Sequence, residues 1–189
     1  MNMKVEDLIF KSPLWSNDKK VVVYRGRSNP LILFVGEAPG QDENRSGIPF
    51  IGRSGKVLDN WLYTFSIYNY SGITNAVPLI PLTEAGSIRK PTNEEIDYFK
   101  PFLKEVIIQT SPNLIICLGD SAVYSLTKKR IAQMKFDIDR TNEYRIPITA
   151  IYHPSYYLRR GEDGIIDFKW LYENIILEVL PQVKSITIL

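Results

Sequence analysis

The chain of 189 residues contains a single cysteine and a single histidine, and it has no long apolar run. One cysteine, Cys117, excludes an intramolecular disulfide framework and favours a reducing compartment. No apolar stretch approaches the roughly 20 residues that a membrane-spanning helix needs, and the amino terminus lacks the apolar core of a secretory signal. We therefore expect a protein that stays inside the cell and does not enter a membrane.

A large excess of either charge is also missing. Lys and Arg number 23 against 21 Asp and Glu, which gives a net charge of +2. Any basic surface that binds a polyanion must then be local. Hydrophobic residues at 44% and charged residues at 23% are typical of a globular protein. The length predicts one domain over residues 1–189.

The most informative stretch is 31–58, which begins with the apolar run LILFV. Such a run is typical of a strand buried on both faces of a parallel sheet. The glycine-rich turn GEAPG follows at 36–40, then a polar loop, and a helix is predicted at 52–62. In open α/β sheets a strand, turn and helix in this order form a ligand site. The same pattern also occurs in purely structural turns.

Three further apolar runs predict buried strands, and the segments between them predict helices. Thr92 and Glu95 have the spacing of a capping box, and Pro101 is expected to kink the helix that they begin. This alternation predicts a three-layer α/β/α fold with a central, mostly parallel sheet of four strands. The expected strands are 31–35, 72–77, 113–118 and 146–152, with a short strand at 21–24; the other helices lie at 92–109, from 121 and at 167–180; residues 128–142 are charged and unpatterned.

Three motifs in a fixed order carry a resemblance to a known family: GEAPG at 36–40, GIPFIGRSGKVL at 47–58, and His-Pro-Ser at 153–155. Together they resemble the uracil-DNA glycosylase superfamily, and most of all its iron–sulfur branch, often called family 4. The resemblance implies a monofunctional DNA glycosylase. Such an enzyme flips a nucleotide out of DNA, hydrolyses the bond to uracil or a related modified pyrimidine, and leaves an abasic site.

The resemblance assigns roles to three residues in the base pocket. Phe50 lies where the family stacks the base, and Asn75 matches the asparagine that reads the uracil edge, because an amide offers a donor beside an acceptor. His153 matches the histidine that donates a hydrogen bond to the carbonyl oxygen on which charge develops. Without the resemblance, Asn75 is also consistent with a turn residue, and His153 with a helix cap satisfied by the backbone.

The turn after the first strand differs from the better-known branches of the superfamily. Where those branches have an aspartate that positions water, this chain has Ala38, and where they have a tyrosine that blocks a thymine methyl group it has Gly40. The iron–sulfur branch shares both features. Glu37 is therefore our candidate for ordering the water, with Glu43 as the alternative. Ala38, Gly40 and Glu43 are expected to line the base pocket, and Gly40 leaves room for a base larger than uracil.

DNA, single- or double-stranded, is the expected partner, and a basic segment after His153 is expected to bind it. The sequence SYYLRRG at 155–161 combines aromatic, aliphatic and basic residues, which suits a loop that enters a base stack and contacts phosphates. The tyrosines also fit a helix packed in the core. We expect a monomer in the cytoplasm or nucleoid, or in the nucleus if the source is eukaryotic or viral. The predicted DNA contacts are Arg53, Lys56, Ser155, Tyr156, Leu158, Arg159 and Arg160.

The cysteines are where the chain departs from the iron–sulfur branch, which holds a four-iron cluster on four cysteines. Alignment by motif places Leu79 at the third ligand position and Phe99 near the fourth, and the amino-terminal region has no cysteine. Cys117 falls within a predicted buried strand. The count excludes a four-cysteine cluster. We therefore expect no metal and no cofactor, with apolar packing in place of the cluster.

Two other functions are consistent with parts of the sequence. A catalytically silent member of the same fold that binds DNA or protein has no need to keep Glu37, Phe50, Asn75 and His153 together. A nucleotide-binding α/β protein requires a phosphate loop, and neither the Rossmann nor the P-loop pattern occurs. Glycosylase activity is therefore the favoured interpretation, with a modified pyrimidine as the alternative substrate.

Overall fold

The computed structural model describes residues 3–183 and contains a five-stranded sheet with the order β1-β3-β2-β4-β5. Strands β2 to β5 are parallel to their neighbours, whereas β1 pairs antiparallel with β3. Every residue of the four parallel strands is buried, because helices cover both faces of the sheet. This confirms the predicted three-layer α/β/α fold. The strands are β1 Arg25–Gly26, β2 Ile32–Gly36, β3 Ser71–Asn75, β4 Leu114–Leu118 and β5 Ile148–Ile151.

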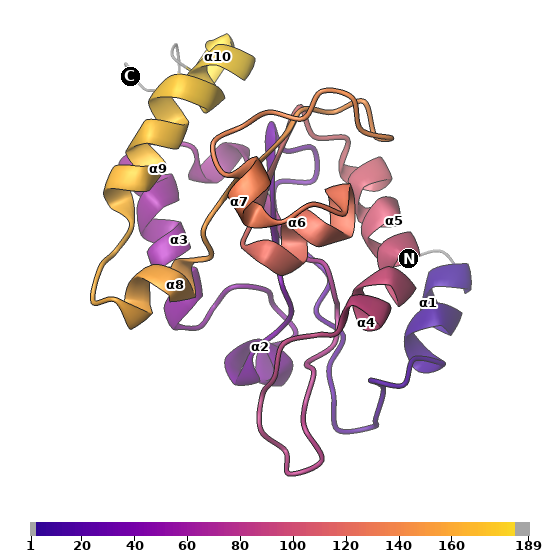
Figure 1. Cartoon of the computed structure of the whole chain (residues 1–189). Helices are drawn as coiled ribbons and strands as arrows, with labels where there is room; N and C mark the ends of the chain where they lie inside the picture. Colours follow the sequence, from indigo (N-terminus) through magenta and orange to yellow (C-terminus); the bar gives the residue numbers. More distant parts are fainter. Residues whose placement is uncertain (1–2, 184–189) are drawn as a thin grey trace.

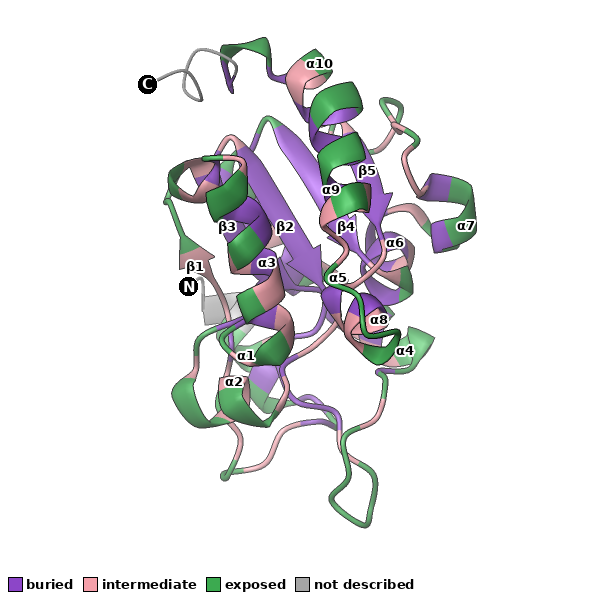
Figure 2. Ribbon diagram, turned by 90° about the vertical axis from the view of Figure 1, so that its left-hand side faces the viewer, coloured by how far each residue is buried: buried purple, intermediate pink, exposed green. Residues whose placement is uncertain are grey.

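Alternate residues of the strands enter two separate cores, one on each face of the sheet. Leu33 and Val35 of β2 pack in one core, and Ile32 and Phe34 pack in the other. Figure 1 shows the helices on the two sides of the molecule, and Figure 2 shows the buried strands between them. The first core is covered by α1 Met3–Phe10, α4 Asn93–Tyr98, α5 Lys100–Thr110, α6 Asp120–Thr127 and α7 Ile131–Met134; the second by α3 Arg53–Thr64, α8 Pro154–Arg159, α9 Ile165–Leu171 and α10 Leu177–Val179.

Two predictions near the first strand were wrong. The short strand expected at 21–24 lies further along, at Arg25–Gly26, because backbone groups of the earlier residues are bonded elsewhere: the Val22 N–H donates to the Pro78 carbonyl at 2.9 Å, and the Val23 carbonyl accepts from the Thr74 hydroxyl at 2.6 Å. Gly26 lies so close to the Ser71 carbonyl oxygen that any side chain there would overlap it. The polar loop expected after the glycine-rich turn is a short helix, α2 Gln41–Ser46.

The long helices are less continuous than their patterns predicted. The capping box of Thr92 and Glu95 is present and begins α4. The helix breaks at Phe99, and Pro101 lies in the first turn of α5, where its missing N–H costs nothing. The closing helix contains a π-helical turn, Tyr172–Ile176, between α9 and α10. No helix within residues 3–183 is long and apolar enough to cross a membrane.

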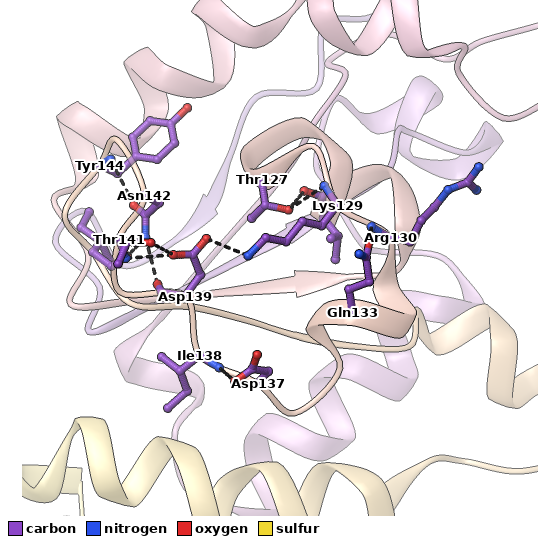
Figure 3. A network of polar contacts seen from close by, with 12 residues as sticks. Thr127, Lys129, Arg130, Gln133, Asp137, Ile138, Asp139, Thr141, Asn142 and Tyr144 are labelled. Carbon is purple, nitrogen blue, oxygen red and sulfur yellow. Dashed lines mark hydrogen bonds and ion pairs between the residues drawn. The ribbon is translucent and has the colours of Figure 1, made fainter.

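A network of polar side chains orders the charged segment that lacks a hydrophobic pattern (Figure 3). The Asp139 carboxylate accepts hydrogen bonds from the backbone N–H and the hydroxyl of Thr141, at 2.8 and 3.0 Å. The Asn142 amide donates to the carbonyl oxygens of Asp139 and Ile146, at 2.9 and 2.7 Å. Side chains therefore satisfy the backbone groups that a helix or strand would otherwise pair.

We expect Asp139→Ala to lower the free energy of unfolding by about 1–3 kcal/mol, because it leaves donors of this network without an acceptor. The Thr141 backbone hydrogen bond is the main cause of the lowered pKa of Asp139, and Lys129 contributes from 3.5 Å. Because the pKa of Asp139 is lower in the folded state, its ionisation stabilises the protein at pH values above the unfolded-state pKa of about 3.9. This stabilisation is lost as the pH falls through the folded-state pKa.

Urea titrations of wild type and variant at several pH values test this prediction. The difference between their free energies of unfolding should become smaller below about pH 4. Asp137→Ala is the matched control, because the exposed Asp137 carboxylate accepts a hydrogen bond from the adjacent Ile138 N–H. Equal stability losses in the two variants would contradict the assigned role of Asp139.

Candidate active site

A cleft of about 300 Å³ lies at the carboxyl edge of the sheet, where β2 and β3 end in register at Gly36 and Asn75. Parallel strands place their following turns at one edge, so segments distant in the sequence meet there. The cleft brings together most of the residues predicted for base binding and catalysis: Glu37, Ala38, Gly40, Glu43, Phe50, Asn75 and His153.

Asn75 is the last residue of β3, and it lies in the cleft wall with only 1% of its surface exposed. Its Oδ1 atom accepts no hydrogen bond from any residue within 3–183. An unpaired buried amide oxygen is costly unless a ligand supplies the donor. Asn75 is therefore arranged to accept a hydrogen bond from a molecule in the cleft, which a turn-forming asparagine would not require.

Phe50 is only 5% exposed, and its backbone adopts a positive φ of 55°. Contacts to that backbone hold the residue in place. Arg25 donates from Nη2 to the Phe50 carbonyl at 3.0 Å and is itself paired with Asp59 at 2.7 Å. Any side chain at Gly55 would overlap the Phe50 backbone, and one at Gly36 would overlap its ring. Two glycines and a partly buried ion pair thus set the position of this aromatic face.

His153 caps the amino terminus of α8, and its ring hydrogen bonds determine which nitrogen carries the proton. Nδ1 accepts from the Ser155 backbone N–H at 3.2 Å and lies 2.9 Å from the Ser155 hydroxyl. Burial, together with the nearby charges of Arg159 and Lys90, lowers the pKa of His153 to about 4. At neutral pH the imidazole is uncharged, and its remaining proton is on Nε2. His153 therefore caps α8 and places an uncharged ring in the wall of the cleft.

The two candidate glutamates have different surroundings. Glu43 accepts from the Gly40 N–H at 3.0 Å, and from the N–H groups of Ile51 and Gly52 at 3.0 and 2.8 Å. Its Oε2 therefore caps the start of α2 at Gly40, and its Oε1 joins α2 to the loop that carries Phe50. Glu37 accepts one hydrogen bond, from the Ser121 hydroxyl to Oε2 at 2.5 Å, which leaves Oε1 for a ligand or water in the cleft.

The predicted DNA contacts lie beside the cleft but do not all border the same hollow. Arg53, at the start of α3, borders the cleft and a hollow that it shares with Ser155, Leu158 and Arg159. A second hollow is shared by Arg53, Tyr156, Leu158 and Arg160. Lys56 is exposed on α3 and borders neither hollow.

The two tyrosines of the segment after His153 have different positions. Tyr156 stacks on Tyr152 at 4.3 Å and has the Arg160 guanidinium 5.6 Å above its ring. Tyr157 is 3% exposed and donates to Asp167 at 2.7 Å, so it belongs to the core. The core interpretation of this segment therefore holds for Tyr157, and Tyr156 remains a predicted DNA contact.

Sequence reasoning missed the groups that hold the site in place. Arg25 and Ser121 act through contacts with residues far away in the sequence, so no local pattern indicates them. Gly55 lies within the motif at 47–58, but its steric role against the Phe50 backbone is visible only in the structure. Ile88 and Arg89 also line the cleft, from the segment between β3 and α4.

The positions that the resemblance assigns to cluster ligands do not fit an iron–sulfur cluster. Leu79 and Phe99 are fully buried and share the first core with Ile9 and Leu14. Burial raises the pKa of the Cys117 thiol, which lies in β4. Within residues 3–183, no three His, Cys, Asp or Glu side chains are grouped as metal ligands. Apolar packing therefore takes the place of the cluster ligands.

The sequence model of the uracil DNA glycosylase superfamily matches residues 23–179. The chain is 32% identical over 161 residues to the Type-4 uracil-DNA glycosylase of Archaeoglobus fulgidus, covering 78% of each chain. It is 32% identical over 178 residues to the one of Thermotoga maritima, covering 92% of this chain and 86% of the relative. For Saccharolobus solfataricus the identity is 32% over 155 residues, 77% of this chain and 70% of the relative.

His153 should remain uncharged from pH 8 down to pH 5, with a pKa of about 4 and the neutral proton on Nε2. Because it is the only histidine, its ring nitrogens can be followed by NMR without other imidazole signals. Arg159→Gln should raise this pKa, since it removes a nearby positive charge. A titration midpoint near 6.5 in the wild type, or a proton on Nδ1, would contradict the proposed arrangement.

Leu79→Ala should lower the free energy of unfolding by about 2–5 kcal/mol, the usual range for a fully buried leucine. The matched control is Ile108→Ala, because Ile108 is 57% exposed on α5, and its effect should stay within about 0.5 kcal/mol. We also expect a chelator to leave the unfolding midpoint unchanged. Stoichiometric iron or zinc in the purified protein would show that a metal supports this region.

Proposed function

The chain belongs to the uracil DNA glycosylase superfamily, and we propose that it excises uracil from DNA by hydrolysis of the N-glycosidic bond, leaving an abasic site. The relatives named Type-4 uracil-DNA glycosylase support this activity. The observation that carries the proposal is the buried Asn75 amide, whose Oδ1 has no protein donor within residues 3–183, in one cleft with a neutral histidine and an aromatic ring. The proposal also takes the chain of 189 residues to be a single domain that acts as a monomer inside the cell.

Each of these three groups suits one feature of an extruded uracil. The base must leave the helix to reach the cleft, and the Phe50 ring offers it a stacking surface. Asn75 Oδ1 accepts from the N3–H of uracil, and the amide NH₂ donates to the neighbouring carbonyl oxygen. Cytosine presents the reverse pattern at these positions. The amide therefore selects uracil over cytosine.

His153 stabilises the departing base. As the glycosidic bond breaks, negative charge develops on a carbonyl oxygen of uracil, and the Nε2–H of a neutral imidazole can donate to it. In a site largely shielded from water such a donor contributes a factor of about 10²–10³ to the rate. The Ser155 N–H and hydroxyl at Nδ1 fix both the tautomer and the ring orientation.

Glu37 orders the water that attacks the sugar. Ala38 has no group that can do so, and the Glu43 oxygens are already bonded to three backbone N–H groups. The hydrogen bond from Ser121 orients the Glu37 carboxylate. Because this carboxylate acts on water rather than on the base, its contribution is separate from that of His153.

A modified pyrimidine is the second candidate substrate, because of the open space at Gly40. A methyl group placed on Gly40 would meet Glu43 Oε2 at 2.8 Å and no other heavy atom within 4 Å outside residues 39–41. The cleft therefore has no bulky side chain at this position that would exclude a substituent on the base.

Incubation with labelled oligonucleotides tests the proposed activity. Strands that carry uracil, or pyrimidines modified at C5, are treated with alkali after incubation, which cleaves at any abasic site. We expect cleavage at uracil in single- or double-stranded DNA. Binding to these strands without cleavage at any base would instead identify a silent DNA-binding protein.

Single-turnover excision should separate the roles of the residues. His153→Ala should slow excision by on the order of 100-fold or more, with little change in affinity for abasic product DNA, which has no base to contact. Asn75→Asp should impair uracil excision because it replaces a donor by an acceptor. Asn174→Asp on the exposed far helix is the matched control and should excise at the wild-type rate. Excision by His153→Ala at the wild-type rate would make Glu37 the main catalytic group.

A further inference from the structure

A hairpin at residues 82–88 projects from the carboxyl edge of the sheet, between β3 and α4. Leu82 and Ile88 form an antiparallel bridge, and the Thr83 N–H donates to the Ser87 carbonyl at 2.8 Å. Gly86 makes the turn at the tip with a φ of +78°. The hairpin extends below all other segments in Figures 1 and 2. No part of the base-binding chemistry described above uses it.

Arg89 holds the base of this hairpin in one conformation. It donates from Nε to the Leu82 carbonyl at 3.1 Å and from Nη1 to the Lys90 carbonyl at 2.9 Å. It also forms two hydrogen bonds with the Glu95 carboxylate, at 2.8 and 2.5 Å. The projection is therefore ordered before any partner binds, which removes most of the entropy cost of ordering it in a complex.

Ile88 is exposed at the cleft, where an aliphatic side chain has no role in holding the fold together. It is 52% exposed, yet it lines the same cleft as Asn75 and His153. Lys90 follows two residues later and is also exposed. Its positive charge is one of those that lower the pKa of His153.

The chemistry of an extruded nucleotide requires contacts on more than one side of the cleft. A DNA strand that delivers one nucleotide into the cleft must continue on both sides of it. Arg53 lines one part of the cleft, next to Arg159 of α8, and Ile88 lines another. Arg53 of α3 and Arg159 of α8 are placed to contact the strand on one side of the extruded nucleotide. The hairpin is the element left to contact the strand on the other side.

We propose that the hairpin is a second DNA-binding element, in which Ile88 packs on the sugar or base next to the extruded nucleotide and Lys90 contacts its phosphate. The proposal rests on the proposed function, because it takes DNA as the ligand of the cleft. Glu84 lies near the tip and would repel phosphates, so the strand follows the flank that carries Ile88 and Lys90. The partner is the substrate strand itself.

Binding of two single variants to DNA tests the proposal. The probe is a fluorescent oligonucleotide with a stable abasic analogue, single- or double-stranded, measured by anisotropy over a range of salt concentrations. Lys90→Gln should lower the log–log salt slope by roughly 0.9 for duplex DNA or 0.7 for single strands. Ile88→Ser should weaken binding roughly 5- to 10-fold with an unchanged slope, because it removes an apolar contact and no charge.

Matched controls carry the same substitutions on surfaces away from the cleft. Ile108→Ser replaces an isoleucine that is 57% exposed on α5, and Lys169→Gln replaces an exposed lysine of α9. Both should bind as the wild type does. Circular dichroism and thermal unfolding confirm that each variant is folded, which we expect because all four side chains are on the surface.

The outcomes distinguish this proposal from the proposed function. If the wild type excises uracil but neither hairpin variant changes affinity or salt slope, the hairpin is not a DNA-binding element. If the control variants weaken binding as much as the hairpin variants do, the assignment of this surface is also wrong. If the wild type excises no base but Lys90→Gln still lowers the salt slope, the hairpin binds DNA and only the proposed catalytic activity fails.

Discussion

The candidate site depends on one steric constraint, which is that residue 36 has no side chain. Gly36 ends β2 in register with Asn75 of β3. A Cβ at this position would overlap the Phe50 ring and lie 2.5 Å from Asn75 Oδ1. The sheet register thus places the amide, and the missing side chain lets the aromatic ring approach it. Burial of β2 and β3 on both faces fixes that register, so packing energy maintains the geometry of the pocket.

The second constraint is electrostatic and keeps His153 uncharged. A charged imidazole would attract a developing anion more strongly, but burial and the charges of Arg159 and Lys90 oppose protonation. The same positive charges attract the phosphates of a DNA strand. This arrangement therefore meets two requirements. The cations attract DNA to the cleft, and the neutral histidine keeps the same tautomer across the physiological pH range.

Much of the fold could be predicted from local patterns, whereas the support of the site could not. The apolar run of β2, the capping box at Thr92 and the strand ends at Asn75 and His153 are visible in the sequence, because each depends on neighbouring residues. The Arg25–Asp59 ion pair and the Glu37–Ser121 hydrogen bond join residues that are distant in the chain. The short helix α2 was missed for the same reason, since Glu43 holds it through backbone groups of residues 51 and 52.

Loss of the cluster ligands changes what stabilises the region behind the cleft. A cluster on four cysteines joins separate segments through bonds that depend on iron and on redox conditions. Here Leu79, just beyond the base-reading strand, and Phe99, between α4 and α5, meet in one apolar core with Ile9 of α1. The same segments are joined by packing, which depends on neither iron nor an oxidant. Because Asn75 precedes Leu79 by only four residues, this packing also supports the position of the amide in the cleft. The position of the Asn75 amide is thus coupled to the packing of this core.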